Sequence, residues 1–412
     1  MTHQENESLF TLGKTQAIKC SGFSSEKEFK KNRAKQKNFT YHCHLCCPTL
    51  KELQTQIKEL EIQLQEKQLH LERFGVSIDY AMALPEDMRS IYRQGDALYF
   101  SSQKDWDILG ASSYMQPHLG DNMIGSPASL ENTRAALQAG VTTIGNISQY
   151  FGWDYPEYSD LEARTEHTVK AIKLMASFKE SGTLIHSNLD DGYGPVADDL
   201  GMLIGYALLE QYIVEDLLHA SLAHSYGDMF HSPFKRLVFL SALKKIHHGN
   251  LVGSMIFTNK LGRCQQDVER NTAHLSQCLL TDMAGQYIYE TGHAVTVMGN
   301  RGLTIHTTPD EIIHTLEYAK ELESYIPELV KTINTDLIDS TADQIIKNGT
   351  RFFKQILSYF EKSVDITDPY ALMLAVKRTG IQTLSRTLAP EGTDTITTDY
   401  KLYHESLLIK SQ

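Results

Sequence analysis

Apolar positions follow a helical spacing in the segment that comes after a polar beginning of the chain. Residues 1–47 are polar, and we expect no strand among them. From residue 48 onward, apolar side chains recur at steps of three and four, which is the spacing of a coiled-coil seam. The seam residues are Leu50, Leu53, Ile57, Leu60 and Leu64. The pattern predicts a helix over 48–74, packed either along its own chain or against a second copy in a homodimer.

Short apolar runs then alternate with helical patterns. The runs predict strands at 76–83, 122–125, 141–147, 183–187, 216–223, 251–258, 293–298 and 303–306. Helices are predicted between them, at 129–139, 160–179, 197–212, 233–246 and 267–290. Because alternating strands and helices form parallel βα units, the pattern predicts an α/β fold, a (β/α)8 TIM-type barrel. A doubly wound open sheet is the alternative, but no G-x-G-x-x-G follows an early strand.

These patterns divide the chain into four expected parts. A polar arm with a Cys/His cluster covers 1–47, and the coiled-coil-like helix covers 48–74. The barrel covers 75–310, and a helical extension with a polar tail covers 311–412. The barrel is therefore expected to carry an N-terminal helical arm and a C-terminal helical extension.

Composition narrows the class of protein. The 412 residues are 41% hydrophobic and 22% charged, which is typical of a folded chain. The net charge of −12 argues against nucleic acid or an anionic membrane as the main partner. No run of about 18 apolar residues predicts a membrane span, and the polar N-terminus lacks a signal-peptide core. We expect a cytoplasmic protein with reduced thiols that acts on a small-molecule substrate.

Polar side chains gather directly after the predicted strands, where a barrel of this type has its active site. His186 and His224 are the candidate acid–base residues, since an imidazole titrates near neutral pH. The candidate substrate-binding residues are Asn146, Gln149, Tyr150, Asn188, Asp190, Tyr193, Asn259, Lys260 and Arg301. Together with Thr258, these strand ends are expected to converge, although turn formation alone accounts for some of the residues.

The sequence gives little support to a metal site or a nucleophile. His219 and His224 are five residues apart in or near one predicted strand, so they face opposite sides and cannot share a metal unless the strand ends between them. The only H-x-H is His42-Cys43-His44, in the polar arm, and there is no H-E-x-x-H or G-x-S-x-G. Cys43, Cys46 and Cys47 include a C-x₂-C spacing without a second pair, and an exposed thiol cluster is the alternative. We expect no catalytic metal.

Three blocks carry a resemblance to a known family. A Pro-Ala-Ser-Leu segment opens a helix within 120–152, residues 186–194 lead into a helix of small residues, and 278–309 combine a helix with two close strands. Over 118–310 the chain resembles the catalytic, barrel-forming component of adenosylcobalamin-dependent glutamate mutase (methylaspartate mutase). The resemblance implies an isomerase, a mutase that rearranges the carbon skeleton of an amino acid or small carboxylic acid by radical chemistry.

The same resemblance implies a cofactor site and a partner. It places Ser225, Tyr226 and Gly227 beside adenosylcobalamin. Because the chain has no D-x-H-x-x-G motif, a small cobalamin-binding subunit is the expected partner. The chain departs from the family pattern at Arg89 and Arg93, the only arginines of 75–118, which match no family motif. A cofactor-free or metal-assisted barrel lyase that uses His186 or His224 as base, and a non-catalytic scaffold subunit, are the alternatives.

Overall fold

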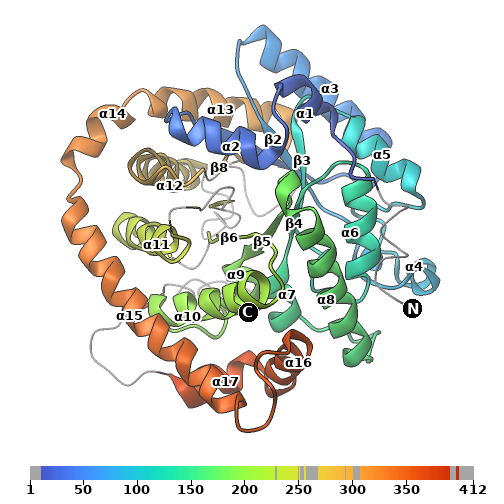
Figure 1. The fold of residues 1–412 in the computed structure, drawn as a ribbon. Coiled ribbons are helices and arrows are strands. Elements are labelled where there is room, and N and C mark those ends of the chain that lie inside the picture. Colours follow the sequence, from blue (N-terminus) through green and yellow to red (C-terminus); the bar gives the residue numbers. More distant parts are fainter. Residues whose placement is uncertain are drawn as a thin grey trace, which may run out of the picture.

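A parallel sheet forms the centre of the molecule (Figure 1). The computed structural model describes residues 11–227, 230–248, 250, 255–256, 268–292, 294–299, 307–389 and 396–398. Within these residues the strand order is β6-β5-β4-β3-β2-β1-β8-β7, and every pairing is parallel. The strands are β1 (Thr40–Leu45), β2 (Arg73–Val76), β3 (Gln116–Leu119), β4 (Thr143–Gly145), β5 (Leu184–Asn188), β6 (Leu222–Ser225), β7 (Met255–Ile256) and β8 (Ala294–Thr296).

The sheet is open, so the predicted closed (β/α)8 barrel is wrong. Backbone pairing runs from β6 to β7 through the other strands, and no ladder between β6 and β7 is present in the described residues. The sheet curls enough to bring these two edge strands near each other. Closure needs a ladder between every pair of neighbouring strands. The two residues of β7 pair with β8, so β7 is an edge strand in the described part of the chain.

Several predicted strands differ from the observed ones. The strands β4, β5, β7 and β8 overlap the predicted runs at 141–147, 183–187, 251–258 and 293–298. In contrast, β1 lies in the arm where no strand was expected, and β3 precedes the predicted 122–125. The strand β6 begins at residue 222 because a helical turn occupies 212–217, and β2 meets its predicted run only at Val76. The predicted strand at 303–306 lies outside the described residues.

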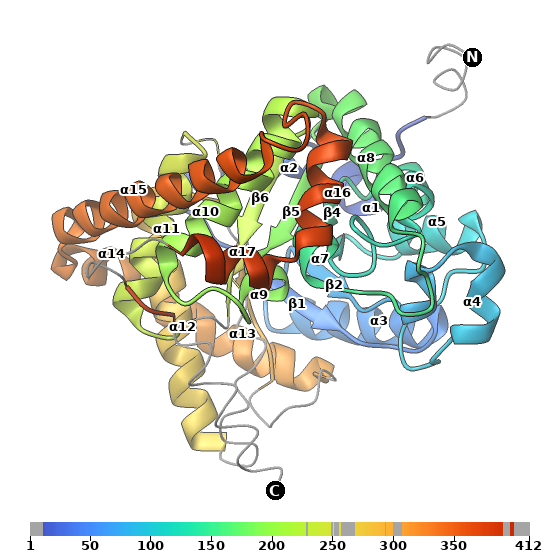
Figure 2. The same cartoon turned by 90° about the horizontal axis from the view of Figure 1, so that it is seen from below.

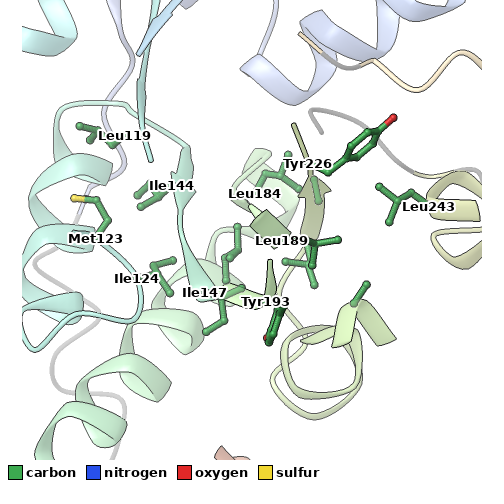
Figure 3. Close-up of a cluster of buried hydrophobic side chains, with 14 of the residues drawn as sticks. Leu119, Met123, Ile124, Ile144, Ile147, Leu184, Leu189, Tyr193, Tyr226 and Leu243 are labelled. Atoms are coloured by element: carbon green, nitrogen blue, oxygen red, sulfur yellow. The ribbon is translucent and has the colours of Figure 1, made fainter. Parts of the chain in front are cut away.

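Helices surround the curled sheet on its outer side (Figure 1). The helices of this ring are α3 (Leu50–Glu66), α5 (Gln103–Ala111), α6 (Ser129–Gln138), α8 (Leu161–Ser177), α10 (Leu200–Gln211), α11 (Pro233–Ile246), α12 (Val268–Tyr289) and α13 (Pro309–Glu323). Apolar side chains of the strands and of these helices form a buried core between the two layers. Figure 3 shows part of this core, from Leu119 and Ile144 to Leu243 on α11. The apolar core therefore lies between the outer face of the sheet and the helices. The inner face of the sheet is not part of this core.

The predicted seam of α3 is buried. Leu53, Ile57, Leu60 and Leu64 are each at most 1% exposed, and Leu50 is half-buried. The helix begins after Thr49, whose side chain accepts a hydrogen bond from the backbone N–H of Glu52. It packs against α5 and α13 of its own chain. A second copy would therefore have to use another face of α3.

A helical extension follows α13 of the ring. Its helices are α14 (Ile326–Leu329), α15 (Thr335–Phe360), α16 (Pro369–Thr379) and α17 (Ile381–Leu388). The long α15 lies across α10 and α11 on the outside of the molecule (Figure 2). A Cβ on Gly349 of α15 would lie 2.7 Å from the backbone oxygen of Gly201, so the two helices approach closely. In the described part of the chain, no helix combines the length and the hydropathy needed to cross a membrane.

Candidate functional site

The inner face of the sheet is polar, whereas its outer face is apolar. Side chains alternate along a strand, and the outward residues include Phe74, Leu119 and Ile144 of the buried core. The inward residues include His42 on β1, His118 on β3 and His186 on β5. The ring of His118 lies edge-on to both others, with centroids 5.9 Å from His42 and 5.0 Å from His186. Three imidazoles from alternate strands thus meet inside the curl.

A helix near the N-terminus closes the amino end of the sheet. The first turn of α2 (Glu26–Lys35) contacts Arg73 of β2 through Glu26 and Ser221, just before β6, through Lys27. Glu26 binds Arg73 of β2 at 2.9 Å and Lys30 at 2.7 Å. Burial raises the pKa of Glu26, but these two cations outweigh burial and hold it below 4.5. Burial lowers the pKa of Lys30 to about 8.

Two of the imidazoles, those of His42 and His118, are kept neutral by their surroundings. His42 and His118 are at most 3% exposed. Burial lowers the pKa of each well below 6.5, and the nearby charge of Arg73 adds to the effect. Neither ring nitrogen of His118 has a hydrogen-bond partner among the residues that the structure describes. His118 is therefore a buried, neutral imidazole with its hydrogen-bonding capacity unused by these residues.

Two glycines, Gly120 and Gly145, lie next to the imidazoles at the carboxyl end of the sheet. A Cβ on Gly120 would lie 3.7 Å from Nε2 of His118. A Cβ on Gly145 would lie 3.2 Å from Nδ1 of His186 and 2.6 Å from the backbone oxygen of Gly120. A Cβ at Gly120 would make an ordinary contact, whereas a Cβ at Gly145 would collide with the backbone of Gly120.

Carboxylates and amides form a hydrogen-bonded network just beyond these glycines. Asp121 follows Gly120 and accepts a hydrogen bond of 2.6 Å from Nε2 of Gln149. Nδ2 of Asn146 donates to Asp191 at 2.8 Å, and the Asn146 side chain also bonds Asp121. Oδ1 of Asn146 accepts from the backbone N–H of Asn188 at 2.8 Å. We call Asp121, Asn146, Gln149, Asn188 and Asp191 the carboxyl-end network.

Asp121 is the accessible carboxyl group of this network. Its side chain is exposed, whereas Asn146 and Gln149 are buried. Desolvation by the surrounding protein raises its pKa above 3.8, although the hydrogen bonds from Gln149 and Asn146 act in the opposite direction. A carboxyl group of this kind, open to solvent and with a raised pKa, is suited to accept and return a proton.

Gly227, which follows β6, is held by charged side chains. The carboxylate of Asp190 accepts from the backbone N–H of Gly227 at 3.0 Å. Arg236 of α11 donates to the Gly227 carbonyl at 2.8 Å and binds both oxygens of Asp282 on α12 at 2.8 Å. This bidentate pair is buried and connects α11 to α12, and Arg236 holds Gly227 against α11.

The structure brings together only part of the predicted site. Asn146, Gln149 and Asn188 belong to the carboxyl-end network, Asp190 lies beside it, and His186 lies on the inner face below it. Tyr150 and Tyr193 instead point into the helical layer, where their hydroxyls bond Thr165 and Glu210. Thr258, Asn259, Lys260 and Arg301 lie outside the described residues.

His224 lies on the outer face of the sheet, away from His186. Its side chain is 0% exposed. Nδ1 lies 2.8 Å from Nε2 of His247, and Nε2 lies 3.0 Å from Oε2 of Glu210. Both ring nitrogens are therefore engaged in the core between sheet and helices, and His224 cannot reach a substrate on the inner face.

Sequence reasoning missed His42, His118 and Asp121. The H-x-H of residues 42–44 lies on β1, the first strand of the sheet, and not in a polar arm. The alternating pattern of polar His42 and His44 with apolar Cys43 and Leu45 is the signal that predicts this strand. Cys43 and Cys47 are buried, so they do not form an exposed thiol cluster. Within the described ranges, no three His, Cys, Asp or Glu side chains are placed to hold one metal ion.

The residues that the resemblance assigns to adenosylcobalamin do not fit the cofactor. Oγ of Ser225 lies 3.4 Å from the Ser187 carbonyl, and the backbone N–H of Gly227 is bound to Asp190. The ring of Tyr226 is fully buried in the core of Figure 3, and its hydroxyl donates to the Arg236 carbonyl at 2.8 Å. These polar groups already have partners within the chain.

Comparison with known proteins gives no family for this chain. No family model matches the sequence, and no curated protein matches it either.

Proposed function

We propose that the chain is an enzyme that transfers a proton to and from a carbon atom of a small polar molecule. The molecule binds at the carboxyl ends of β3, β4 and β5, on the inner side of the open sheet. Reactions of this class include those of lyases and isomerases that need no cofactor. The single observation that carries the proposal is the Asp121 carboxyl group, exposed at this end and with a raised pKa.

The surroundings of Asp121 support a role in proton transfer. Gln149 and Asn146 hold its carboxylate by side-chain hydrogen bonds, which fix the direction of the oxygen atoms. Asn146 is itself held by Asn188 and Asp191, so the base is positioned by a second layer of contacts. A general base needs this combination of fixed geometry and suitable pKa.

Exchange of carbon-bound hydrogen with solvent tests the proposal without a known substrate. The purified chain is incubated in D₂O with small oxo, hydroxy and amino acids, and deuterium incorporation is measured by mass spectrometry. We expect incorporation into at least one compound, and Asp121→Asn should slow it by about 10²-fold or more. Asp107→Asn, an exposed aspartate of α5, is the matched control and should leave the rate unchanged. Absence of wild-type incorporation, or equal rates in wild type and Asp121→Asn, contradicts the proposal.

The pH dependence of this exchange has a defined direction. The carboxylate form of Asp121 accepts the proton, so the rate should rise with pH as the group ionises. Because the pKa of Asp121 is raised, the midpoint of this rise should lie above 3.8. A rate that is independent of pH through the acid range would assign the proton transfer to another group.

The cobalamin-dependent mutase remains a second proposal that rests on the sequence resemblance. Titration of the purified chain with cobalamin, followed by absorbance, tests it with and without a partner protein that carries D-x-H-x-x-G. Saturable binding in either titration supports a mutase component. Its absence in both rejects this proposal and leaves the proton-transfer proposal unaffected.

A further inference from the structure

His118 occupies a position from which a neutral imidazole can act on a substrate held at Asp121. Both residues belong to the same strand end, separated by Leu119 and Gly120. Nε2 of His118 lies toward Gly120, the residue next to Asp121, and Gly120 has no side chain to cover it. On the neighbouring strand β4, Gly145 lies close to the backbone of Gly120 and to the ring of His186.

The state of His118 is unusual for a structural histidine. It is 3% exposed, and neither nitrogen has a hydrogen-bond partner in the described part of the molecule. Leaving a buried polar group without a partner costs about 1–3 kcal/mol. His224, in the same sheet, shows the alternative in which both nitrogens are bonded. The unused capacity of His118 points toward a ligand on the inner face.

We infer that His118 is a catalytic residue whose neutral imidazole donates a hydrogen bond to the carbonyl oxygen of a small 2-oxo compound. The inference rests on the proposed function and names its substrate class. Asp121 takes a proton from the carbon next to the carbonyl group. The electron pair of that C–H bond forms a C=C bond, and the carbonyl electron pair moves onto oxygen. His118 stabilises the resulting enolate oxygen, and return of a proton to carbon regenerates the carbonyl compound.

The charges around His118 favour this assignment over a protonated imidazole. Lys30 and Arg73 lie on its amino-end side, and Glu26 balances only one of them. An added positive charge on His118 is disfavoured there, whereas a negative charge on the substrate oxygen is favoured. A neutral imidazole is known to polarise a carbonyl group beside a carboxylate base in other enzymes.

Two variants of His118 separate catalysis from folding. His118→Phe keeps a ring but removes the donor, and His118→Gln keeps a side-chain N–H. With pyruvate, 2-oxobutyrate and 2-oxoglutarate as probes, we expect His118→Phe to lower the deuterium-exchange kcat by about 10²–10³-fold with little change in KM. His118→Gln should restore part of the rate, and both should keep the acid-range pH profile set by Asp121. His314→Phe, an exposed histidine of α13, is the control.

The outcomes distinguish the inference from the proposed function. Exchange that is lost in Asp121→Asn but unchanged in both His118 variants overturns the role of His118 and leaves the proposed function in place. Exchange into hydroxy or amino acids, but not into 2-oxo compounds, overturns the substrate class alone. No exchange into any compound overturns the proposed function. If His118→Phe does not fold, the rate of His118→Gln and the shift of the His118 ring nitrogens on adding pyruvate to ¹⁵N-labelled protein decide the question.

Discussion

His224 shows how hydrogen bonding fixes the role of a single residue. Its imidazole lies between Glu210 of α10 and His247, which follows α11, with no exposed surface. Glu210 also accepts a hydrogen bond of 2.7 Å from Tyr193. The histidine therefore provides a hydrogen bond to the buried carboxylate of Glu210. It also connects β6 to two helices of the outer layer. Its contribution should appear in stability rather than in turnover.

His224→Gln should lower the free energy of unfolding by about 1–3 kcal/mol, because the amide cannot bond both Glu210 and His247 and leaves a buried group unsatisfied. Urea unfolding monitored by circular dichroism measures the change. The exchange rate of the folded variant should equal that of the wild type. His314→Gln, an exposed control, should change stability by less than about 0.5 kcal/mol. If His224→Gln has normal stability but no longer catalyses deuterium exchange, His224 has a catalytic role and this assignment is wrong.

The face on which a residue lies could not be predicted here without the strand register. A predicted strand at 216–223 places His224 at a free strand end, but β6 spans 222–225 and turns this side chain outward. A one-residue change of register moves every side chain to the opposite face. Asn146 and Asn188 lie at strand ends, where the well-defined apolar runs before them place them; their role in substrate binding stays a prediction. Asp121 was missed because β3 contains Pro117 and two polar residues, so its sequence lacks the apolar pattern that predicts a strand.

At the scale of elements, α3 shows the pattern that sequence predicts best. Its apolar positions repeat at helical spacing over 17 residues, and the same positions are buried. The period of a long amphipathic helix is a property of the local sequence alone. The strand β1 lies next to this helix in sequence, yet it was missed, because its alternation extends over only six residues of mixed polarity. Short inner strands with polar inward side chains give little signal.

Ile57→Ala should destabilise the protein by about 2–5 kcal/mol, because it removes a buried side chain from the centre of the α3 seam and leaves a cavity. Ile62→Ala is the matched control on the same helix, since Ile62 is 47% exposed. The control should cost less than about 1 kcal/mol. Chemical denaturation of both variants measures the difference. Equal destabilisation by the two substitutions would show that the seam does not pack as described.

At the scale of the whole molecule, the helical extension is joined to the sheet-bearing part. Phe352 and Ile345 of α15 are buried against the body of the protein. A Cβ on Gly205 of α10 would lie 2.6 Å from the Phe352 ring, so the contact depends on glycine at the crossing. Because α15 also packs against α11, the extension and the sheet should unfold together.

Gly349→Val should lower the melting temperature of the entire chain, because its side chain would collide with the Gly201 backbone and with Ile204. We expect about 1–3 kcal/mol of destabilisation and one shifted transition in calorimetry and in far-UV circular dichroism. Thr350→Val, the next position of α15, introduces the same residue without this collision and serves as control. A separate early transition that involves only helical signal would show that the extension is an independent unit.

The strand order has a consequence for folding during synthesis. Strands β1 to β6 are neighbours in the same order as in the sequence, but β8 pairs with β1 across more than 240 intervening residues. As the nascent chain leaves the ribosome, β1 is an edge strand with unpaired backbone groups until residues 294–296 emerge. Unpaired strand edges promote association with other chains. The unpaired edge of β1 is therefore prone to association with other chains for most of the time that the protein is being synthesised. Binding of a chaperone to residues 40–45 would cover this edge.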